Sequence, residues 1–170
     1  DALAATPAQV RPKAGNEVTL SWKDGLSFQS ADGMFKAKLG GRLQLDAAGF
    51  SEDDDVEALV GDIPAGVEVR RARLSFEGEF GLNMPLFFKT EYDFAPDETQ
   101  FKDVYLGFDK VPVIGRITAG HFKEPMGLEM LTSSRFLTFL ERSAANDAFT
   151  PERNLGVMVS GARFEERTTY

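Results

Sequence analysis

The stretch FKAKLGGRLQLDA, residues 35–47, decides the fold of this chain. Apolar or small residues fill every odd position from Phe35 to Ala47, while all the even positions except Gly40 carry Lys, Arg, Gln or Asp. Successive side chains of a β-strand point to opposite faces, so this alternation predicts one long strand with an apolar face and a charged face.

The same alternation continues outward in both directions. Toward the N-terminus, residues 18–30 predict a short hairpin around a Lys-Asp-Gly turn. The expected long strands run for roughly 9 to 14 residues, which exceeds the usual length in soluble sheets and approaches the length that crosses a bilayer. Toward the C-terminus these strands are expected at 67–80, 85–94, 100–109, 113–122 and 154–164.

Two all-β architectures fit this pattern. In a soluble sandwich the polar face meets water, whereas in a transmembrane β-barrel the apolar face meets lipid and the polar face lines a water-filled lumen. The strand length, the Phe-rich apolar faces and the alternation of tight turns with long connections favour the barrel. We therefore expect an antiparallel transmembrane β-barrel portion over 18–170, preceded by a flexible leader at 1–17 and carrying an acidic external loop at 51–66.

Composition narrows the function classes. The chain of 170 residues has no cysteine and a single histidine, His121, so neither a thiolate site nor a His-based zinc site can form, and no cofactor is expected. The net charge of −8 disfavours nucleic acid as a partner. Paired carboxylates such as Glu77/Glu79 and Glu91/Asp93 arise whenever a strand has a polar face, and no nucleophile or phosphate-loop motif accompanies them, so we predict no enzyme.

Arginines give the stronger functional signal. Arg71 and Arg73 share a strand face, and Arg42 lies on the polar face of the preceding strand. Such cations projecting into one lumen attract anions, and Arg binds oxyanions through paired hydrogen bonds. Neutralisation by carboxylates on comparable faces is an equally open interpretation.

The stretch LTSSRFLTFLER, residues 131–142, differs from its surroundings. Its Thr-Ser-Ser start and the apolar spacing that follows predict a short amphipathic helix. Arg135 and Arg142 are seven positions apart and would share one face of that helix. The helix would narrow a barrel from within or pack against a soluble core.

Three segments carry a family resemblance. KLGGRLQLD at 38–46, VRRARLSFEGEF at 69–80 and GHFKEPMGLEMLTSSRFLTFLERS at 120–143 resemble, in order, the phosphate-selective O and P porins of Gram-negative outer membranes. The resemblance implies a 16-stranded, usually trimeric barrel in which residues 123–152 fold inward as the constriction loop. It also implies a bilayer with lipopolysaccharide as surroundings and a small phosphate-like anion as solute.

The resemblance further implies an anion-binding constriction and a barrel longer than this chain, of which about six or seven strands would lie here. Met130 stands where phosphate-selective members have a lysine, so the preferred anion, phosphate or polyphosphate, is not fixed by the match. A general, weakly selective porin and a soluble periplasmic β-rich protein that binds an oxyanion remain alternatives. The implied site residues are Arg42, Arg70, Arg71, Arg73, Asp103, Ser133, Ser134, Arg135 and Arg142.

Overall fold

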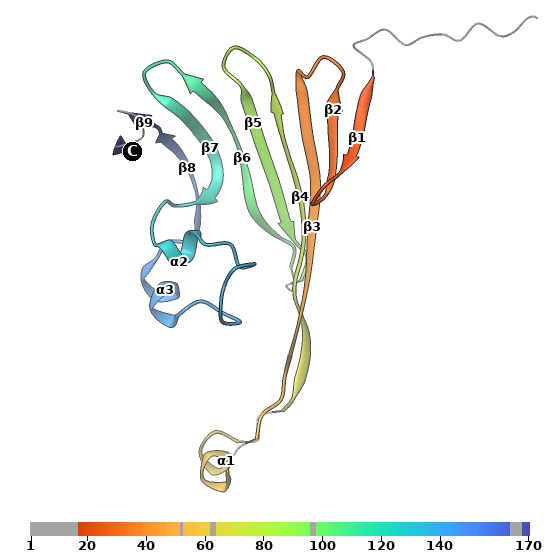
Figure 1. Ribbon diagram of the computed structural model, residues 1–170. Helices are drawn as coiled ribbons and strands as arrows, with labels where there is room; N and C mark the ends of the chain where they lie inside the picture. The colour runs from red at the N-terminus through yellow and green to blue at the C-terminus, as the bar shows by residue number, and fades with distance from the viewer. Residues whose placement is uncertain (1–16, 52, 62–63, 96–97, 164–167) are drawn as a thin grey trace, which may run out of the picture.

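The computed structural model describes residues 17–51, 53–61, 64–95, 98–163 and 168–170 (Figure 1). Most of the expected leader, residues 1–16, lies outside the described residues. The dominant element is an antiparallel sheet whose eight strands follow one another in chain order. Its strands are β1 Val18–Trp22, β2 Leu26–Ser30, β3 Phe35–Ala48, β4 Gly66–Phe80, β5 Leu86–Asp93, β6 Gln100–Val111, β7 Gly115–Lys123 and β8 Arg153–Ser160.

The predicted all-β antiparallel fold is confirmed. Strand bounds differ from the expected ones by a few residues, and the sheet counts eight strands because the short hairpin β1–β2 joins the long strands. The sheet is curved but not closed: it runs from β1 at one edge to β8 at the other (Figure 1). Beyond β8, the short strands β9 Ala162–Arg163 and β10 Thr168–Thr169 form a separate two-stranded ladder.

The two longest connections of the described chain leave the sheet at the same end (Figure 1). The connection after β3 contains helix α1, Asp54–Val60, so the expected acidic loop is partly helical. The connection after β7 contains α2, Leu128–Leu131, and α3, Ala144–Phe149. None of the helices that the structure describes is long and apolar enough to cross a membrane.

The prediction of a helix within residues 131–142 is wrong. Leu131 is the last residue of α2, and the residues after it form turns and bends. Thr132 ends α2 with an extended backbone, φ −60° and ψ 130°, and its carbonyl accepts a hydrogen bond from the Arg142 guanidinium at 2.9 Å. Hydrogen bonds between distant parts of the loop thus replace the helical ladder that the local pattern favoured. Arg135 and Arg142 consequently share no helix face.

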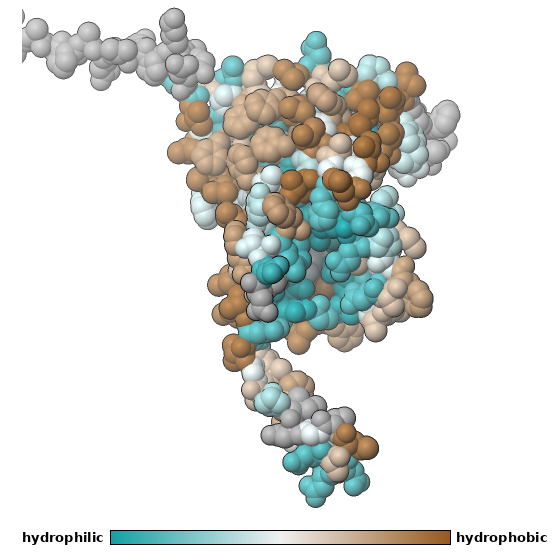
Figure 2. Space-filling model, turned by 180° about the vertical axis from the view of Figure 1, so that it is seen from behind, coloured by the Kyte–Doolittle hydropathy of each residue, from teal (hydrophilic) through white to brown (hydrophobic). Residues whose placement is uncertain are grey.

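The sheet covers its polar face and exposes its apolar face. Arg71 and Asp93 are 7% and 2% exposed, whereas Leu43 and Val157 are 67% and 72% exposed. Hydrophilic side chains gather around a hollow, and hydrophobic side chains dominate the surface above it (Figure 2). Among the described residues, the buried hydrophobic side chains are limited to Ala37, Phe122 and Met130. A water-soluble sandwich would bury its Leu and Val residues instead, so this distribution predicts that the outward face contacts lipid.

Neighbouring substitutions on opposite faces of β4 test this orientation. Leu74 lies on the exposed apolar face, and Ser75 lines the cavity on the other face. In lipid bilayers, Leu74→Arg in the full-length protein is expected to lower the free energy of unfolding by about 2–4 kcal/mol, because a guanidinium on the lipid face loses its hydration. Ser75→Arg is expected to cost much less. Denaturant titration of the bilayer-inserted protein measures both, and equal losses would contradict a lipid-facing Leu74.

Candidate functional site

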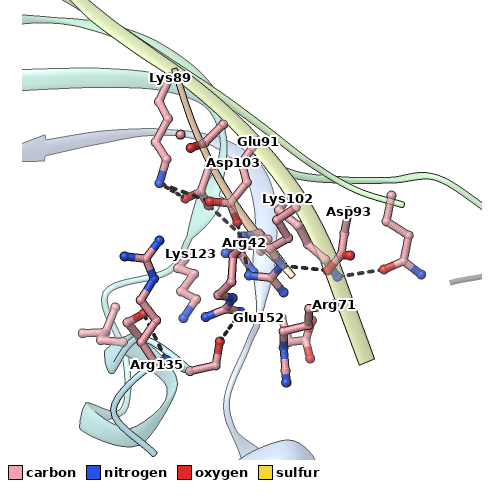
Figure 3. A pocket seen from close by; sticks show the side chains of 18 of the residues that line it. Arg42, Arg71, Lys89, Glu91, Asp93, Lys102, Asp103, Lys123, Arg135 and Glu152 are labelled. Atoms are coloured by element: carbon pink, nitrogen blue, oxygen red, sulfur yellow. Dashed lines mark hydrogen bonds and ion pairs between the residues drawn. The ribbon is translucent and has the colours of Figure 1, made fainter. Parts of the chain in front are cut away.

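A cavity of about 710 Å³ lies between the polar face of the sheet and the loop that follows β7. The strands β3 to β8 supply one wall, and residues 130–142 of the loop supply another. The close-up in Figure 3 shows cationic and acidic side chains from both walls pointing into the same space. All nine residues that the sequence indicated line this cavity: Arg42, Arg70, Arg71, Arg73, Asp103, Ser133, Ser134, Arg135 and Arg142.

The cavity has a charge opposite to that of the whole chain. Eleven of its lining residues are Lys or Arg and eight are Asp or Glu. The complete chain, in contrast, has a net charge of −8. Cations are therefore concentrated where the sheet and the loop face each other, and low-dielectric walls strengthen their field there.

Two β-bulges determine which charges enter the cavity. Opposite Gln44 and Leu45 of β3, the register of β4 skips Arg70, so Arg70 and Arg71 both line the cavity although they are adjacent in sequence. A bulge inserts one extra residue into a strand and re-aims its side chains. Simple alternation would have placed Arg70 on the lipid-facing side.

The second bulge lies in β6. Thr90 pairs with Val104 and Tyr92 pairs with Phe101, so two residues of β6, Lys102 and Asp103, stand opposite the single residue Glu91. Both Lys102 and Asp103 line the cavity. Each bulge thus adds one cation that the alternating pattern would exclude.

A continuous chain of ion pairs covers the strand wall. Asp103 accepts from Lys89 at 2.8 Å and from Arg153 at 2.7 Å, and it therefore links β5 and β8 through β6. At the other end, Arg73 lies 3.2 Å from Glu91 and 2.7 Å from Asp93. These carboxylates neutralise the cations that they contact, so local neutralisation, the other interpretation of the charged strand faces, describes part of the site. In order, the chain is Asp93, Arg73, Glu91, Lys89, Asp103 and Arg153.

Other arginines fasten the loop to the sheet. The Arg70 Nε donates to a Glu141 carboxylate oxygen at 2.5 Å, and the same oxygen lies 3.6 Å from Arg71. Arg71 also donates to the Gln44 side chain at 3.0 Å. Arg42 on β3 donates to the Ser134 hydroxyl at 2.7 Å. The loop is thus attached to β4 through Glu141 and to β3 through Ser134.

Arg142 holds the loop together internally. Its guanidinium donates to the backbone carbonyls of Glu129 at 3.1 Å and Thr132 at 2.9 Å. The Glu129 carboxylate in turn accepts from the Ser143 backbone N–H at 2.8 Å and from the Ser143 hydroxyl at 2.7 Å, and these bonds hold the pKa of Glu129 below its usual value. Gly127, with φ +78°, precedes α2 and gives the chain a conformation that favours glycine at this turn. The Arg142 guanidinium is therefore occupied by hydrogen bonds to backbone carbonyls.

Most apolar side chains of residues 131–142 do not anchor this segment to the sheet. Phe136, Phe139 and Leu140 are 79%, 80% and 64% exposed. The contacts that seat the loop are instead polar, as those of Glu141 and Ser134 show. Because the segment is not helical, its apolar residues do not form the single stripe that the sequence predicted.

Sequence reasoning missed several cavity residues that bear charge, among them Glu141, Lys102 and Lys123. Glu141 was not singled out because nothing in the local pattern shows that it meets Arg70 and Arg71. Lys102 would point outward if β6 alternated regularly, and only the bulge in β6 brings it to the cavity. Lys123 is the last residue of β7, and its ammonium donates to the carbonyl of Met130 in the loop.

Comparison with known proteins identifies sequences that are similar to this chain. The family model described as phosphate-selective porin O and P matches residues 37–168. An uncharacterized protein of Caulobacter vibrioides is 32% identical over 90% of this chain and 29% of its own length. Porin O of Pseudomonas aeruginosa is 31% identical over 77% of this chain and 30% of its own length. No solved structure gives a significant match.

The family match covers the structural features described above. It begins within β3, the strand that the alternating stretch predicted, and ends at the start of β10. It therefore includes both bulges, the ion-pair chain and the whole loop after β7. The aligned part spans less than a third of the length of either relative. The chain belongs to the phosphate-selective porin O and P family.

Proposed function

We propose that the full-length protein is an outer-membrane channel through which small anions diffuse. The observation that carries this proposal is the excess of cations over carboxylates around a cavity in an otherwise acidic chain. Fixed cations along a pore lower the free energy of an anion by replacing part of its hydration. Membership of the porin family supports a diffusion channel in the outer membrane of a Gram-negative bacterium.

The mechanism needs positioning and charge but no covalent step. An anion that enters the cavity meets guanidinium groups of Arg42 and Arg135, which come from the sheet and the loop respectively. Ser133 and Ser134 add hydroxyl groups at the same wall. Binding must be weak enough for the anion to leave, and several shared contacts meet that need better than one tight site. The polar loop contacts keep the two walls at a fixed separation.

The groups that line the cavity also bear on which anion the channel prefers. Phosphate or polyphosphate fits a cavity rich in guanidinium and ammonium groups, since both groups bind phosphate oxygens. Met130 offers no charge at the loop position where phosphate-selective members carry lysine, so any phosphate preference rests on the other cations. A trimer surrounded by lipid and lipopolysaccharide is the assembly that the family resemblance implies for the full-length protein.

A general, weakly selective porin is the second candidate. The specific observation in its favour is the ion-pair chain, in which Asp93, Glu91 and Asp103 neutralise three cations of the wall. The soluble oxyanion-binding alternative is disfavoured, because the exposed Leu and Val side chains of the sheet would meet water and because the family is one of porins.

Ion selectivity distinguishes the two porin candidates. The full-length protein in planar lipid bilayers, with a salt gradient of KCl across the membrane, is expected to show a zero-current potential of the sign that chloride permeation produces. The physical reason is the local excess of fixed cations. A potential near zero would favour the weakly selective porin, and a potential of the opposite sign would overturn the anion channel.

Two loop arginines are expected to act differently. Arg135 has no side-chain hydrogen bond or ion pair among the described residues, whereas Arg142 holds two loop carbonyls. We predict that Arg135→Gln reduces the anion-to-cation permeability ratio about two- to threefold without disturbing the loop, as expected from losing one pore charge. Arg142→Gln is expected to make single-channel current noisier, because the loop loses its internal fastening.

Single-channel recordings of both variants provide the measurement, with the wild type as reference. Equal noise in Arg142→Gln and wild type would show that Arg142 does not stabilise the loop. An unchanged permeability ratio in Arg135→Gln would remove Arg135 from the conduction path.

A further inference from the structure

The cations of the cavity divide into two groups by the partners that they already have. Within the described part of the chain, ion pairs engage Arg70, Arg71, Arg73, Lys89 and Arg153. A cation in contact with a carboxylate attracts a further anion less, because the two charges largely cancel at the distance of the anion. The cations without a carboxylate partner are therefore the ones from which a bound anion gains most.

Lys123 belongs to the second group. Its ammonium carries three N–H donors, and among the described residues the only partner it has is the Met130 carbonyl. Two donors remain for a solute. Lys123 lies at the junction of β7 and the loop, is partly covered, and lines the cavity next to Met130. Its charge is thus held in place by a neutral group and is not cancelled.

Lys102 is held in the same way. Its ammonium donates to the Gln100 side-chain oxygen at 2.7 Å and, in the described structure, has no carboxylate within ion-pair distance. The bulge in β6 places it beside Asp103 on the cavity wall. Asp103 does not neutralise it, because both Asp103 oxygens already accept from Lys89 and Arg153.

Arg42, on β3, is a third member of this group. It donates to the neutral Ser134 hydroxyl, and its Nε is the one buried side-chain nitrogen or oxygen of the described residues without a hydrogen-bond partner. A buried N–H without an acceptor costs free energy that an oxyanion can recover. The labelled side chains in Figure 3 show Arg42, Lys102 and Lys123 lining the same pocket, with Arg135 on the loop side.

From this division we infer that Lys102 and Lys123, together with Arg42, directly bind the permeating anion, and that the cations of the ion-pair chain do not. The inference rests on the proposed anion channel and names two contact residues, Lys102 and Lys123, that the sequence motifs did not indicate. The ligand class is a small oxyanion with more than one negative charge, because these three uncancelled cations line one cavity and keep donors available for it.

Block of chloride current by inorganic phosphate tests the inference. The full-length protein is recorded in planar bilayers in 1 M KCl, where the Debye length is only about 3 Å and distant charges are screened. Lys123→Gln and Lys102→Gln are each expected to raise the phosphate concentration for half-block about tenfold, the loss typical of one charged hydrogen bond. Lys89→Gln removes the same charge from the same wall but from a neutralised position, and it is expected to change the half-block concentration less than twofold.

Two further controls keep the outcomes distinct. Lys123→Arg retains a cation with donors and is expected to restore block toward the wild-type value, and heat-dependent migration on gels confirms that each variant is folded. The assignment of the lysines is overturned if Lys123→Gln and Lys89→Gln have equal effects, or if phosphate does not block an anion-selective wild type. Either result would leave the proposed anion channel standing. A cation-selective wild type overturns the proposed anion channel itself.

Discussion

The structure depends on one constraint: the charged side chains of the sheet must find partners on its concave face, because the other face is apolar. Arg71 and Asp93 are nearly inaccessible while Leu43 and Val157 are largely exposed. Covered charges require ion pairs or hydrogen bonds. The chain of pairs from Asp93 to Arg153 and the neutral partners of the remaining cations satisfy this requirement. The function of the cavity follows from the same requirement, since it determines which cations stay available.

Much of the fold could be predicted from the sequence. The period of two in residues 35–47 and in the later strands reflects a physical difference between the two faces, and it located every long strand to within a few residues. Local turn chemistry located the hairpin of β1 and β2 in the same way. The helix expected within residues 131–142 does not form, because the sequence pattern reflects only interactions between residues that are close in sequence. Arg142 reaches back to two carbonyls of the same loop, and no local propensity shows such a contact.

Several arginines of the candidate site were predictable, whereas Arg153 and Lys102 were not. Arg42, Arg71 and Arg73 lie on the polar rows of regular strands, so alternation identified them. The position of Lys102 on the cavity wall depends on an extra residue in β6. The register of a strand with a bulge cannot be predicted from its hydrophobic pattern. Which cation pairs with which carboxylate likewise depends on side chains brought together from β4, β5, β6 and β8.

The bonds between Glu129 and Ser143 have a consequence for how the protein folds. They close a short ring within the loop, and Arg142 reinforces it from inside. The entropy lost on closing a chain segment rises with its length. When the loop has already formed these internal bonds, the effective length of the connection between β7 and β8 is therefore much shorter. Strand pairing at this position can then follow local order in the loop, so the long connection need not slow the assembly of the sheet.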